Sequence, residues 1–330
     1  MFVFAISIIV LAQLGCISAK AITSSRQVTS DVHLAVSPNC GSLSGPPADI
    51  NNGLKPLSNY STIVAFGDSY TSGSIFNGSA LPPPVLSPPN PNAGGRITNG
   101  PLWVENLAAA ANATLQDWAV NGSVIDHNMY PSINFGDIPD YLTQVQNYIG
   151  VRPSSVVDDT LYVIFMGMGD YELRNGKEFS LSEIYQGPQS LTTLASDLIY
   201  SILELNSNPV FAKNFLIVDN YGRGTESTAG DAYKESLFNQ LYEVSNNLDY
   251  DLSFAFVDFK TIWDGVLNGS PGYEAFGYTD AGACLSNDNS MNAECDDPDH
   301  TFYWIPENPS AATHSIMADY VQEVLAQCES

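Results

Sequence analysis

Short apolar runs alternate with segments of helical periodicity along most of this sequence. The apolar runs that are typical of buried strands cover 61–66, 114–120, 160–166, 214–219 and 252–257. The segments with helical spacing of apolar residues cover 101–112, 137–149, 181–205, 229–248 and 310–327. A strand followed by a helix, repeated along a chain, is typical of a parallel sheet with helices on both faces. The pattern therefore predicts an α/β fold, a three-layer α/β/α sandwich around a mainly parallel five-stranded sheet.

Residues 1–21 have the pattern of a signal peptide rather than that of a folded element. Residues 2–15 form an almost wholly apolar run, and Ala19-Lys20-Ala21 supplies the small residues of a cleavage site. The apolar run is too short to favour a membrane span. We therefore expect a mature protein that is secreted into the extracellular space and does not associate with a membrane.

The rest of the sequence favours one domain. Residues 22–59 are polar and irregular, and we interpret them as a lead-in to the domain. Residues 77–95 are rich in proline and predict a long loop, since proline cannot lie inside a sheet. No internal repeat is present, and a chain of this length with 44% apolar residues can bury one large core. We expect residues 60–330 to form a single domain and the protein to be a monomer.

The cysteines and the sequons fit a secreted protein. Removal of the signal peptide with Cys16 leaves four cysteines, for which three pairings exist. The short acidic loop between Cys284 and Cys295 favours one bridge, and the usual proximity of domain termini favours Cys40–Cys328 as the other. Asn-x-Ser/Thr sequons, which after a signal peptide favour glycosylation, begin at Asn59, Asn77, Asn112, Asn121 and Asn268.

The charge of the chain excludes several classes of partner. Eleven basic and 36 acidic residues give a formal net charge of −25. Nucleic acids and anionic membrane surfaces are excluded, because binding them requires clustered Lys and Arg. We interpret the acidity as an aid to solubility. The alternative is calcium binding by the Asp-rich loop 287–299, which lacks the Asp-x-Asp-x-Asp-Gly spacing. Without a Cys-x-x-Cys pair or clustered histidines, we expect no zinc site.

One strand is followed by a serine that is suited to nucleophilic chemistry. Residues 64–73 read Val-Ala-Phe-Gly-Asp-Ser-Tyr-Thr-Ser-Gly. The pattern predicts a buried strand that delivers Ser69 to a tight turn at its carboxyl end, where open α/β sheets place their chemistry. The segment resembles the first sequence block of the GDSL (SGNH) ester hydrolases, with Ser69 in the nucleophile position. Residues 95–105 contain Asn-Gly-Pro-Leu-Trp, which resembles a segment of the fungal acetylesterases of carbohydrate esterase family sixteen and of the thermolabile-haemolysin-like lipases.

This resemblance covers about residues 61–328 and implies an SGNH, flavodoxin-like fold. It also implies hydrolysis of acetyl or other short-acyl esters of small molecules or carbohydrates, without a metal or an organic cofactor. In such an enzyme a histidine takes the proton of the serine, a carboxylate orients that histidine, and amide donors stabilise the oxyanion. The remaining sequence blocks can be compared with each of these requirements.

The oxyanion donors that the resemblance implies are present in part. The amide of Ser69 is one donor, and Gly122, within the second block at Trp118–Ser123, is the position of another. The third block has the family pattern Gly-x-Asn-Asp, whereas this chain reads Gly167-Met168-Gly169-Asp170. The asparagine donor is therefore replaced by Gly169. The loss of one oxyanion donor typically lowers the rate by about 10²–10³.

The last block departs further from the family pattern. The pattern is Trp-Asp-x-x-His-Pro, and residues 304–309 read Trp-Ile-Pro-Glu-Asn-Pro. Ile305 thus stands in the carboxylate position and Asn308 in the histidine position. Isoleucine cannot orient an imidazole, and an asparagine amide does not accept a proton near neutral pH. Asp297 and His300 have the Asp-x-x-His spacing eight residues upstream and are candidate substitutes, with His127 as the other candidate base.

The sequence therefore predicts a secreted member of the GDSL ester hydrolases with impaired or lost activity. One alternative is a binding module that retains the site for acylated sugars without cleaving them. Another is a secreted surface protein that uses the scaffold for interactions. Aromatic residues around the site would favour sugar binding, and an apolar patch elsewhere would favour contact with a protein.

Overall fold

A six-stranded sheet forms the centre of the computed structural model, which describes residues 31–151, 157–175, 191–221, 228–247, 249–287, 289–291 and 294–329. The strands, in spatial order, are β1 (Ile50–Asn52), β6 (Ser253–Asp258), β5 (Asn214–Asp219), β4 (Thr160–Phe165), β2 (Thr62–Gly67) and β3 (Thr114–Asp117). Strands β2 to β6 run parallel to their neighbours, and β1 is antiparallel to β6. Each of the five apolar runs in the sequence is a strand, which confirms the mainly parallel sheet.

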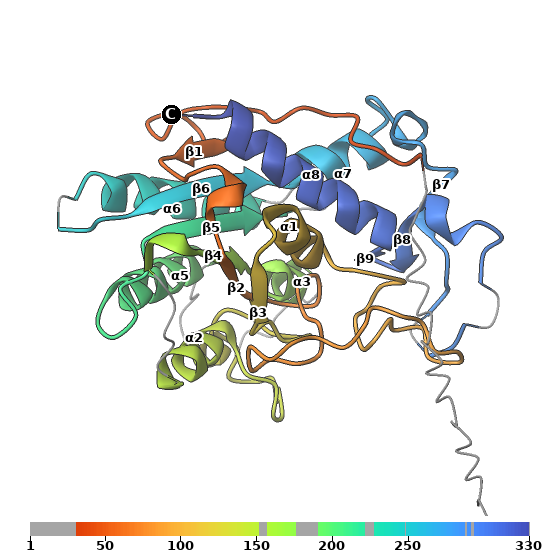
Figure 1. The fold of residues 1–330 in the computed structure, drawn as a ribbon, viewed down its shortest axis with the longest axis horizontal. Coiled ribbons are helices and arrows are strands. Elements are labelled where there is room, and N and C mark those ends of the chain that lie inside the picture. The colour runs from red at the N-terminus through yellow and green to blue at the C-terminus, as the bar shows by residue number, and fades with distance from the viewer. Residues whose placement is uncertain are drawn as a thin grey trace, which may run out of the picture.

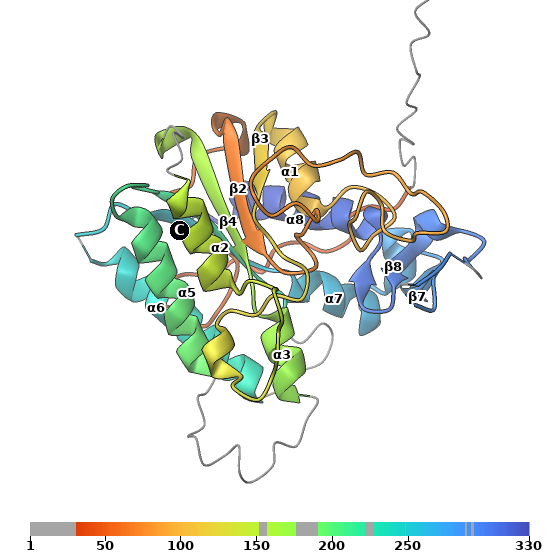
Figure 2. The same cartoon turned by 90° about the horizontal axis from the view of Figure 1, so that it is seen from below.

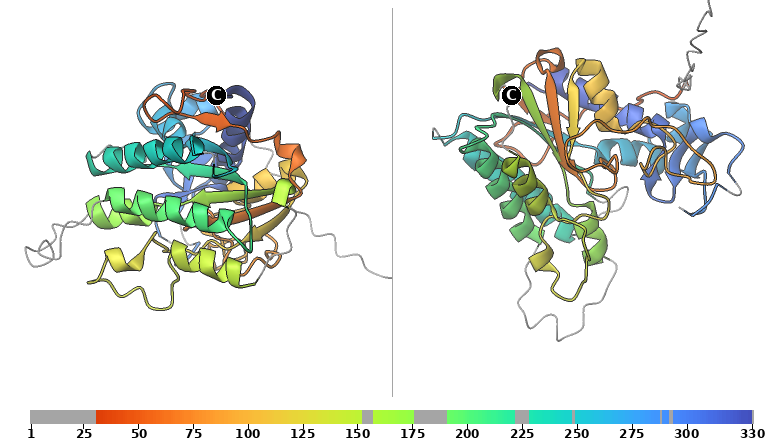
Figure 3. Two further views of the ribbon diagram at one scale, coloured as in Figure 1. Left: turned by 90° about the vertical axis from the view of Figure 1, so that its left-hand side faces the viewer. Right: turned by 60° about the horizontal axis from the view of Figure 1, so that its bottom comes forward.

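Helices cover both faces of this sheet. They are α1 (Trp103–Ala111), α2 (Tyr141–Gly150), α3 (Met168–Asn175), α5 (Leu191–Asn206), α6 (Thr228–Ser245), α7 (Lys260–Leu267) and α8 (Ala311–Gln327). Helices α1, α7 and α8 pack on one face, and α2, α5 and α6 pack on the other, as Figures 2 and 3 show. The three-layer α/β/α sandwich is therefore confirmed. The first part of the helix expected at 181–205 lies outside the described residues.

The sheet has six strands rather than five, because part of the expected lead-in joins it. Residues Ile50–Asn52 form the edge strand β1, so the prediction that residues 22–59 are irregular is wrong at this point. This Ile-Asn-Asn segment is too short to have a strand signal of its own. The Asn51 N–H donates to the Cys328 carbonyl oxygen at 2.6 Å, and Cys40 is disulfide-bonded to Cys328. Contacts with the C-terminus, which lies beside β1 in Figure 1, thus hold the strand in place.

A second, small sheet lies beyond the carboxyl end of the main sheet, beside α7. It consists of β7 (Asp280–Ala283), β8 (Thr301–Ile305) and β9 (Asn308–Pro309) and is seen at the right of Figure 1. A disulfide between Cys284 and Cys295 closes a loop between β7 and β8. Both predicted disulfide pairings are therefore confirmed. The sequence pattern did not predict this sheet, because its strands are short and two of them contain mostly polar or small residues.

The register of three central strands aligns the ends from which the site is built. Gly67 on β2 pairs with Phe165 on β4, and Phe165 pairs with Val218 on β5. The residues two positions beyond these partners are Ser69, Gly167 and Asn220. Because the strands are parallel, these three positions follow neighbouring strands at the same edge of the sheet, the edge that carries the chemistry of open α/β proteins.

Candidate active site

Ser69 lies in a tight turn directly after β2. The carbonyl oxygen of Asp68 accepts hydrogen bonds from the Thr71 and Ser72 N–H groups at 3.1 and 2.9 Å, which forms one helical turn around Ser69. Gly67 allows this turn, since a Cβ there would lie 2.8 Å from Thr71 Oγ1. Ser69 is half-buried, at the carboxyl end of its strand. The turn that the sequence predicts for the nucleophile position is therefore formed.

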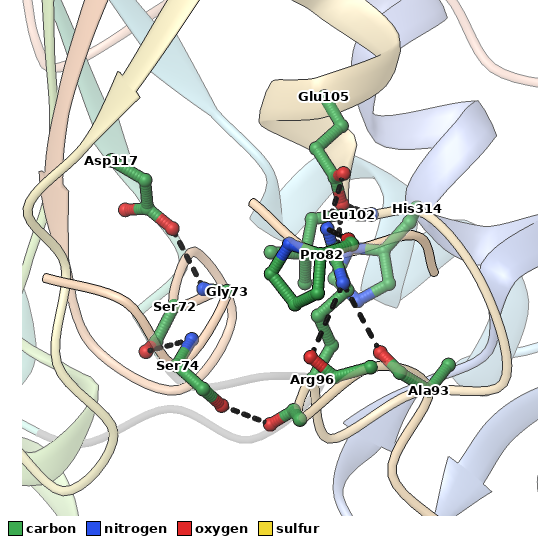
Figure 4. A network of polar contacts seen from close by, with 12 residues as sticks. Ser72, Gly73, Ser74, Pro82, Ala93, Arg96, Leu102, Glu105, Asp117 and His314 are labelled. Atoms are coloured by element: carbon green, nitrogen blue, oxygen red, sulfur yellow. Dashed lines mark hydrogen bonds and ion pairs between the residues drawn. The ribbon is translucent and has the colours of Figure 1, made fainter. Parts of the chain in front are cut away.

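A buried carboxyl group joins this turn to the end of β3. Asp117, which is fully buried, accepts the Gly73 N–H at 2.7 Å and the Ala119 N–H at 2.9 Å. Figure 4 shows the first of these bonds. Burial raises the pKa of the Asp117 carboxyl to about 8. One side chain thus fixes the Ser69 turn relative to the segment that leads to Gly122.

Gly122 lies in the loop after β3, at the same edge of the sheet. Its φ of +80° is in the left-handed region that favours glycine. Gln144 of α2 holds this loop beside the end of β2, because its Nε2 donates to the Gly67 carbonyl oxygen at 3.0 Å and to Ser123 Oγ at 2.9 Å. Gln144 also accepts the Gly67 N–H at 3.1 Å. The segments that carry two of the expected oxyanion donors are therefore brought together. No sequence signal singled out Gln144.

The third block packs against the second but has little space for a larger side chain at residue 169. Asp170 accepts the Ile125 N–H at 3.1 Å and the Tyr130 hydroxyl at 2.6 Å, which ties α3 to the loop after Gly122. Gly169 lies in the first turn of α3. A Cβ at this position would lie 3.0 Å from the Ser123 carbonyl oxygen. The packing at residue 169 therefore leaves little space for the asparagine of the family pattern.

The hairpin between β8 and β9 carries the positions at which the resemblance places the acid and the base. Ile305 and Asn308 are cross-strand partners on either side of the turn at Pro306 and Glu307. Ile305 is 4% exposed, within a small apolar cluster around Trp304. The Asn308 amide donates to the Pro306 carbonyl oxygen at 3.2 Å. The hydroxyl of Tyr70 donates a hydrogen bond to the Glu307 carbonyl oxygen.

The Tyr70 bond joins the Ser69 turn directly to this hairpin. Tyr70 is 1% exposed, and its ring stacks on Trp263 with 6.0 Å between ring centroids. Because Tyr70 follows Ser69 and Glu307 precedes Asn308, the bond brings the nucleophile position and the histidine position into adjacent turns.

The segment around Arg96 is joined to the end of the Ser69 turn, because the Ser74 hydroxyl donates to the Gly95 carbonyl oxygen. Arg96 is fully buried and makes two hydrogen bonds of 2.6 Å with Glu105 on α1. It also donates to the Pro82 carbonyl oxygen at 2.9 Å, as Figure 4 shows. Asn99 accepts the Ala311 N–H at 2.7 Å, at the start of α8. This segment therefore connects the proline-rich loop 77–95 with two helices. Apart from the family resemblance, no sequence pattern predicted this structural role.

None of the four histidines, all of which the structure describes, makes a hydrogen bond with Ser69. His300 binds Asp297 through Nδ1 at 2.8 Å and Asp31 through Nε2 at 2.7 Å, so both ring nitrogens have partners. Its hydrogen bonds to Asp297 and then Asp31 raise the pKa of His300. The ring of His127 stacks on Phe135, and its Nδ1 lies 3.8 Å from Asp140.

His314 is buried in α8, and its ring is kept neutral. Its Nδ1 accepts a hydrogen bond from the Trp103 N–H at 3.2 Å. This gives a partner to a backbone N–H in the first turn of α1, which has no partner within the helix. Burial lowers the pKa of His314 to about 3. Since Nδ1 is an acceptor, the neutral ring carries its proton on Nε2, and that nitrogen has no lone pair with which to act as a base.

The surface features of the sequence can also be placed. The asparagines of all five sequons are exposed: Asn59, Asn77, Asn112, Asn121 and Asn268. Asn121 directly precedes Gly122.

In the described ranges, no cluster of three or more His, Cys, Asp or Glu side chains is arranged to hold a metal ion. No helix in these ranges has the length and apolar character that a membrane span needs.

Comparison with known proteins identifies one family. The model of the GDSL-like lipase/acylhydrolase family matches residues 63–321. An acetylesterase from Hypocrea jecorina is 26% identical over 228 residues, which are 60% of this chain and 62% of that protein. A thermolabile hemolysin from Vibrio parahaemolyticus is 32% identical over 113 residues, 33% of this chain and 25% of that protein. The chain thus spans less than two thirds of the length of both curated relatives.

Among solved structures, an acetylxylan esterase from Geobacillus stearothermophilus aligns with a TM-score of 0.44 and 16% identity, over 82% of this chain and 96% of that chain. An active-site mutant of a family two carbohydrate esterase from Clostridium thermocellum aligns with a TM-score of 0.43 and 19% identity. That alignment covers 82% of this chain and 63% of the other.

Proposed function

Because the chain belongs to the GDSL-like lipase/acylhydrolase family, we propose that it is a secreted, glycosylated family member in which ester hydrolysis is impaired. Its ligands are acetyl or other short-acyl esters, of small molecules or of carbohydrates. The acetylesterase from Hypocrea jecorina, which is similar over 60% of this chain, supports this class of ester. We propose Ser69 as the nucleophile position and the Ser69 and Gly122 amides as the remaining oxyanion donors.

The observation that carries this proposal is the hydrogen bond from Tyr70 to Glu307, which places the 305–308 hairpin next to the Ser69 turn. At the two positions where a carboxylate and a histidine would act on Ser69, the chain has Ile305 and Asn308. A serine hydroxyl without a base is a weak nucleophile at neutral pH. In a well-studied protease, removal of a triad member leaves a rate that is only about 10³–10⁴ times the rate of the uncatalysed reaction in water. Gly169 removes a further expected donor.

The direct test is hydrolysis of p-nitrophenyl acetate by the mature protein and by Ser69→Ala. We expect both to stay near the background rate at neutral pH. Ser72→Ala, in the same turn, is the matched control for damage to the backbone around the nucleophile. Robust turnover that Ser69→Ala abolishes and Ser72→Ala preserves would overturn the proposal of impaired activity. His300→Ala, Asp297→Ala and His127→Ala would then identify the base.

A second candidate function is binding of acylated sugars without cleavage. This function is favoured by the features that keep the site in shape without a proton relay. They are the intact Ser69 turn, the left-handed conformation of Gly122 and the hydrogen bonds of Asp117 and Gln144. Titration of acetylated methyl glycosides into the protein separates this function from that of a surface protein that uses only the scaffold. Saturable binding that Ser69→Trp blocks supports a retained sugar site, and no binding contradicts it.

Secretion and glycosylation are proposed from the N-terminal pattern and the five exposed sequons. Residues 1–21 lie outside the described part of the chain. Mass spectrometry of the protein recovered from culture medium should find an N-terminus at Ile22 and glycan on sequon asparagines. Retention of residues 1–21 on the recovered protein would contradict the cleavage.

A further inference from the structure

The side chain of Asn220, directly after β5, is buried and has no hydrogen-bond partner among the described residues. The residue is 1% exposed, and neither its Nδ2 nor its Oδ1 bonds to any group in the part of the chain that the structure describes. Buried polar side chains in folded proteins are nearly always hydrogen-bonded, and an unsatisfied amide lowers stability. Such a group in a family built to bind ligands is a candidate for contact with a ligand.

The register of the sheet relates Asn220 to Ser69. Phe165 of β4 pairs with Gly67 of β2 on one side and with Val218 of β5 on the other. Ser69 lies two positions after Gly67, and Asn220 lies two positions after Val218. Neighbouring strands are about 4.8 Å apart, so two strand spacings separate these positions by about 10 Å. An acylated sugar ring has a comparable length. A ligand with its ester at Ser69 therefore extends far enough to reach the end of β5.

The side chain of Asn220 is placed on the same face of the sheet as Tyr70, the residue after Ser69. Val218 and Tyr70 both belong to the core under α1, α7 and α8. Asp219 points to the opposite face, where its carboxylate lies 3.3 Å from Lys234 of α6. Because side chains alternate along a strand, Asn220 lies on the face of Val218.

The position between Ser69 and Asn220 carries no side chain. Gly167 has a φ of +122°, and the nearest atom to the point where a Cβ would stand is Tyr171 Cε2, 3.5 Å away. Any larger residue would be strained at this φ. The Cβ of any other residue here would point toward Tyr171 and Tyr233 on the α6 face, 3.6 Å from the Tyr233 hydroxyl, so this position places no side chain on the face of Asn220.

We propose that Asn220 recognises a free hydroxyl group of an acylated sugar whose ester lies at Ser69. The Asn side chain offers an NH₂ donor and a carbonyl acceptor, and a hydroxyl group is both an acceptor and a donor. Because Asn220 is buried, a hydroxyl bound there leaves water completely, and a buried polar group discriminates strongly against a ligand that leaves it unpaired. This inference rests on the proposed function and adds the residue and the ligand group that determine specificity.

The test compares two probes by titration calorimetry in the Ser69→Ala background, which prevents residual turnover. One is a singly acetylated methyl glucoside with its other hydroxyls free, and the other is the fully acetylated methyl glucoside. We expect the first to bind at least about tenfold more tightly, and Asn220→Leu to abolish this preference. Asn220→Leu should also raise the Tm by about 2–4 °C, since it removes an unpartnered amide.

Tyr233→Phe is the matched control. The Tyr233 hydroxyl is also buried and unpartnered within the described residues, but its ring lies in the core on the α6 side of the sheet. Its removal should raise the Tm without changing the preference between the probes. Two outcomes overturn the role of Asn220 and leave the proposed function standing. One is a preference for the singly acetylated probe that survives in Asn220→Leu. The other is equal binding of both probes by the protein that retains Asn220. If neither probe binds, the sugar-ester class of the proposed function fails as well.

Discussion

The hydroxyl of Tyr70 donates a hydrogen bond to the carbonyl oxygen of Glu307, 237 residues further along the chain. This bond fixes the Ser69 turn against the turn between β8 and β9. Glu307 itself has a φ of +64°, in the left-handed region. The hairpin that carries residues 305 and 308 is therefore held against the Ser69 turn, and neither residue has an ionisable side chain. Substitutions at these two positions can test the proposal that the protein lacks only the proton relay.

Restoring the relay should restore hydrolysis. We expect Ile305→Asp with Asn308→His to give measurable turnover of p-nitrophenyl acetate, whereas each single change gives none, because triad members act as a unit. Adding Gly169→Asn should raise the rate by up to about 10²–10³ if the Ser123 carbonyl moves to accommodate the new Cβ. The measurement is kcat/KM with Ser69→Ala in the same background as control. A folded triple variant without activity would show that the site positions are misassigned.

Ile305→Asp alone should destabilise the fold. The side chain of Ile305 is packed in the apolar cluster around Trp304, and none of the described residues of this cluster is a cation that could pair with a carboxyl group. We expect a loss of about 3 kcal/mol in the free energy of unfolding by urea. Ile305→Val, which removes one methyl group, should cost only about 1 kcal/mol. Equal losses in the two variants would mean that residue 305 is in contact with water.

The contribution of His300 to the stability of the folded protein should depend on pH. Its hydrogen bonds to Asp297 and Asp31 raise its pKa in the folded protein above the ordinary value of 6.5. Protonation therefore stabilises the fold fully below pH 6.5, and this contribution is lost as the pH rises through the folded-state pKa. The Tm difference between the wild type and His300→Gln should be present at pH 5 and vanish at high pH. A difference that is the same at both pH values would contradict this linkage.

The ion pair between Arg96 and Glu105 should stabilise the proline-rich loop. Arg96→Met leaves Glu105 without its partner and also removes the bond to Pro82. We expect a loss of about 3 kcal/mol in the free energy of unfolding, and faster proteolysis within residues 77–95. The double variant Arg96→Met with Glu105→Leu should recover part of this loss, because it no longer contains an unpaired charge. A double variant less stable than Arg96→Met would indicate that the packing of Glu105 matters more than its charge.

The two disulfides should contribute unequally. Cys40–Cys328 joins residues 288 apart, whereas Cys284–Cys295 joins residues only 11 apart. In the loop-entropy account, the first constrains the unfolded chain by about 5–6 kcal/mol and the second by about 3 kcal/mol. Urea unfolding of the two paired Cys→Ser variants measures the difference. A larger loss from the short loop would show that native contacts of the small sheet, rather than chain entropy, dominate.

Features that depend on neighbours along the chain could be predicted before any contact was known. The five parallel strands follow from apolar runs, and the turn at Ser69 follows from Gly67 and Asp68 directly after one of them. The disulfide pairing could be predicted because one loop is short and the other bridge joins the two ends of the domain. These signals are local or depend on general properties of domains, so they can be read before any contact is known.

Contacts between residues far apart in the sequence could not be predicted in this way. Ile50–Asn52 becomes a strand because the C-terminus and β6 hold it, and not through any pattern of its own. His300 binds Asp31, 269 residues away. The burial of Asn220, with no partner in the ranges that the structure describes, depends on how three layers pack around the end of β5. Packing of this kind sets the burial, the pKa and the free hydrogen-bonding capacity of a side chain, because each is a property of the groups that surround it in space.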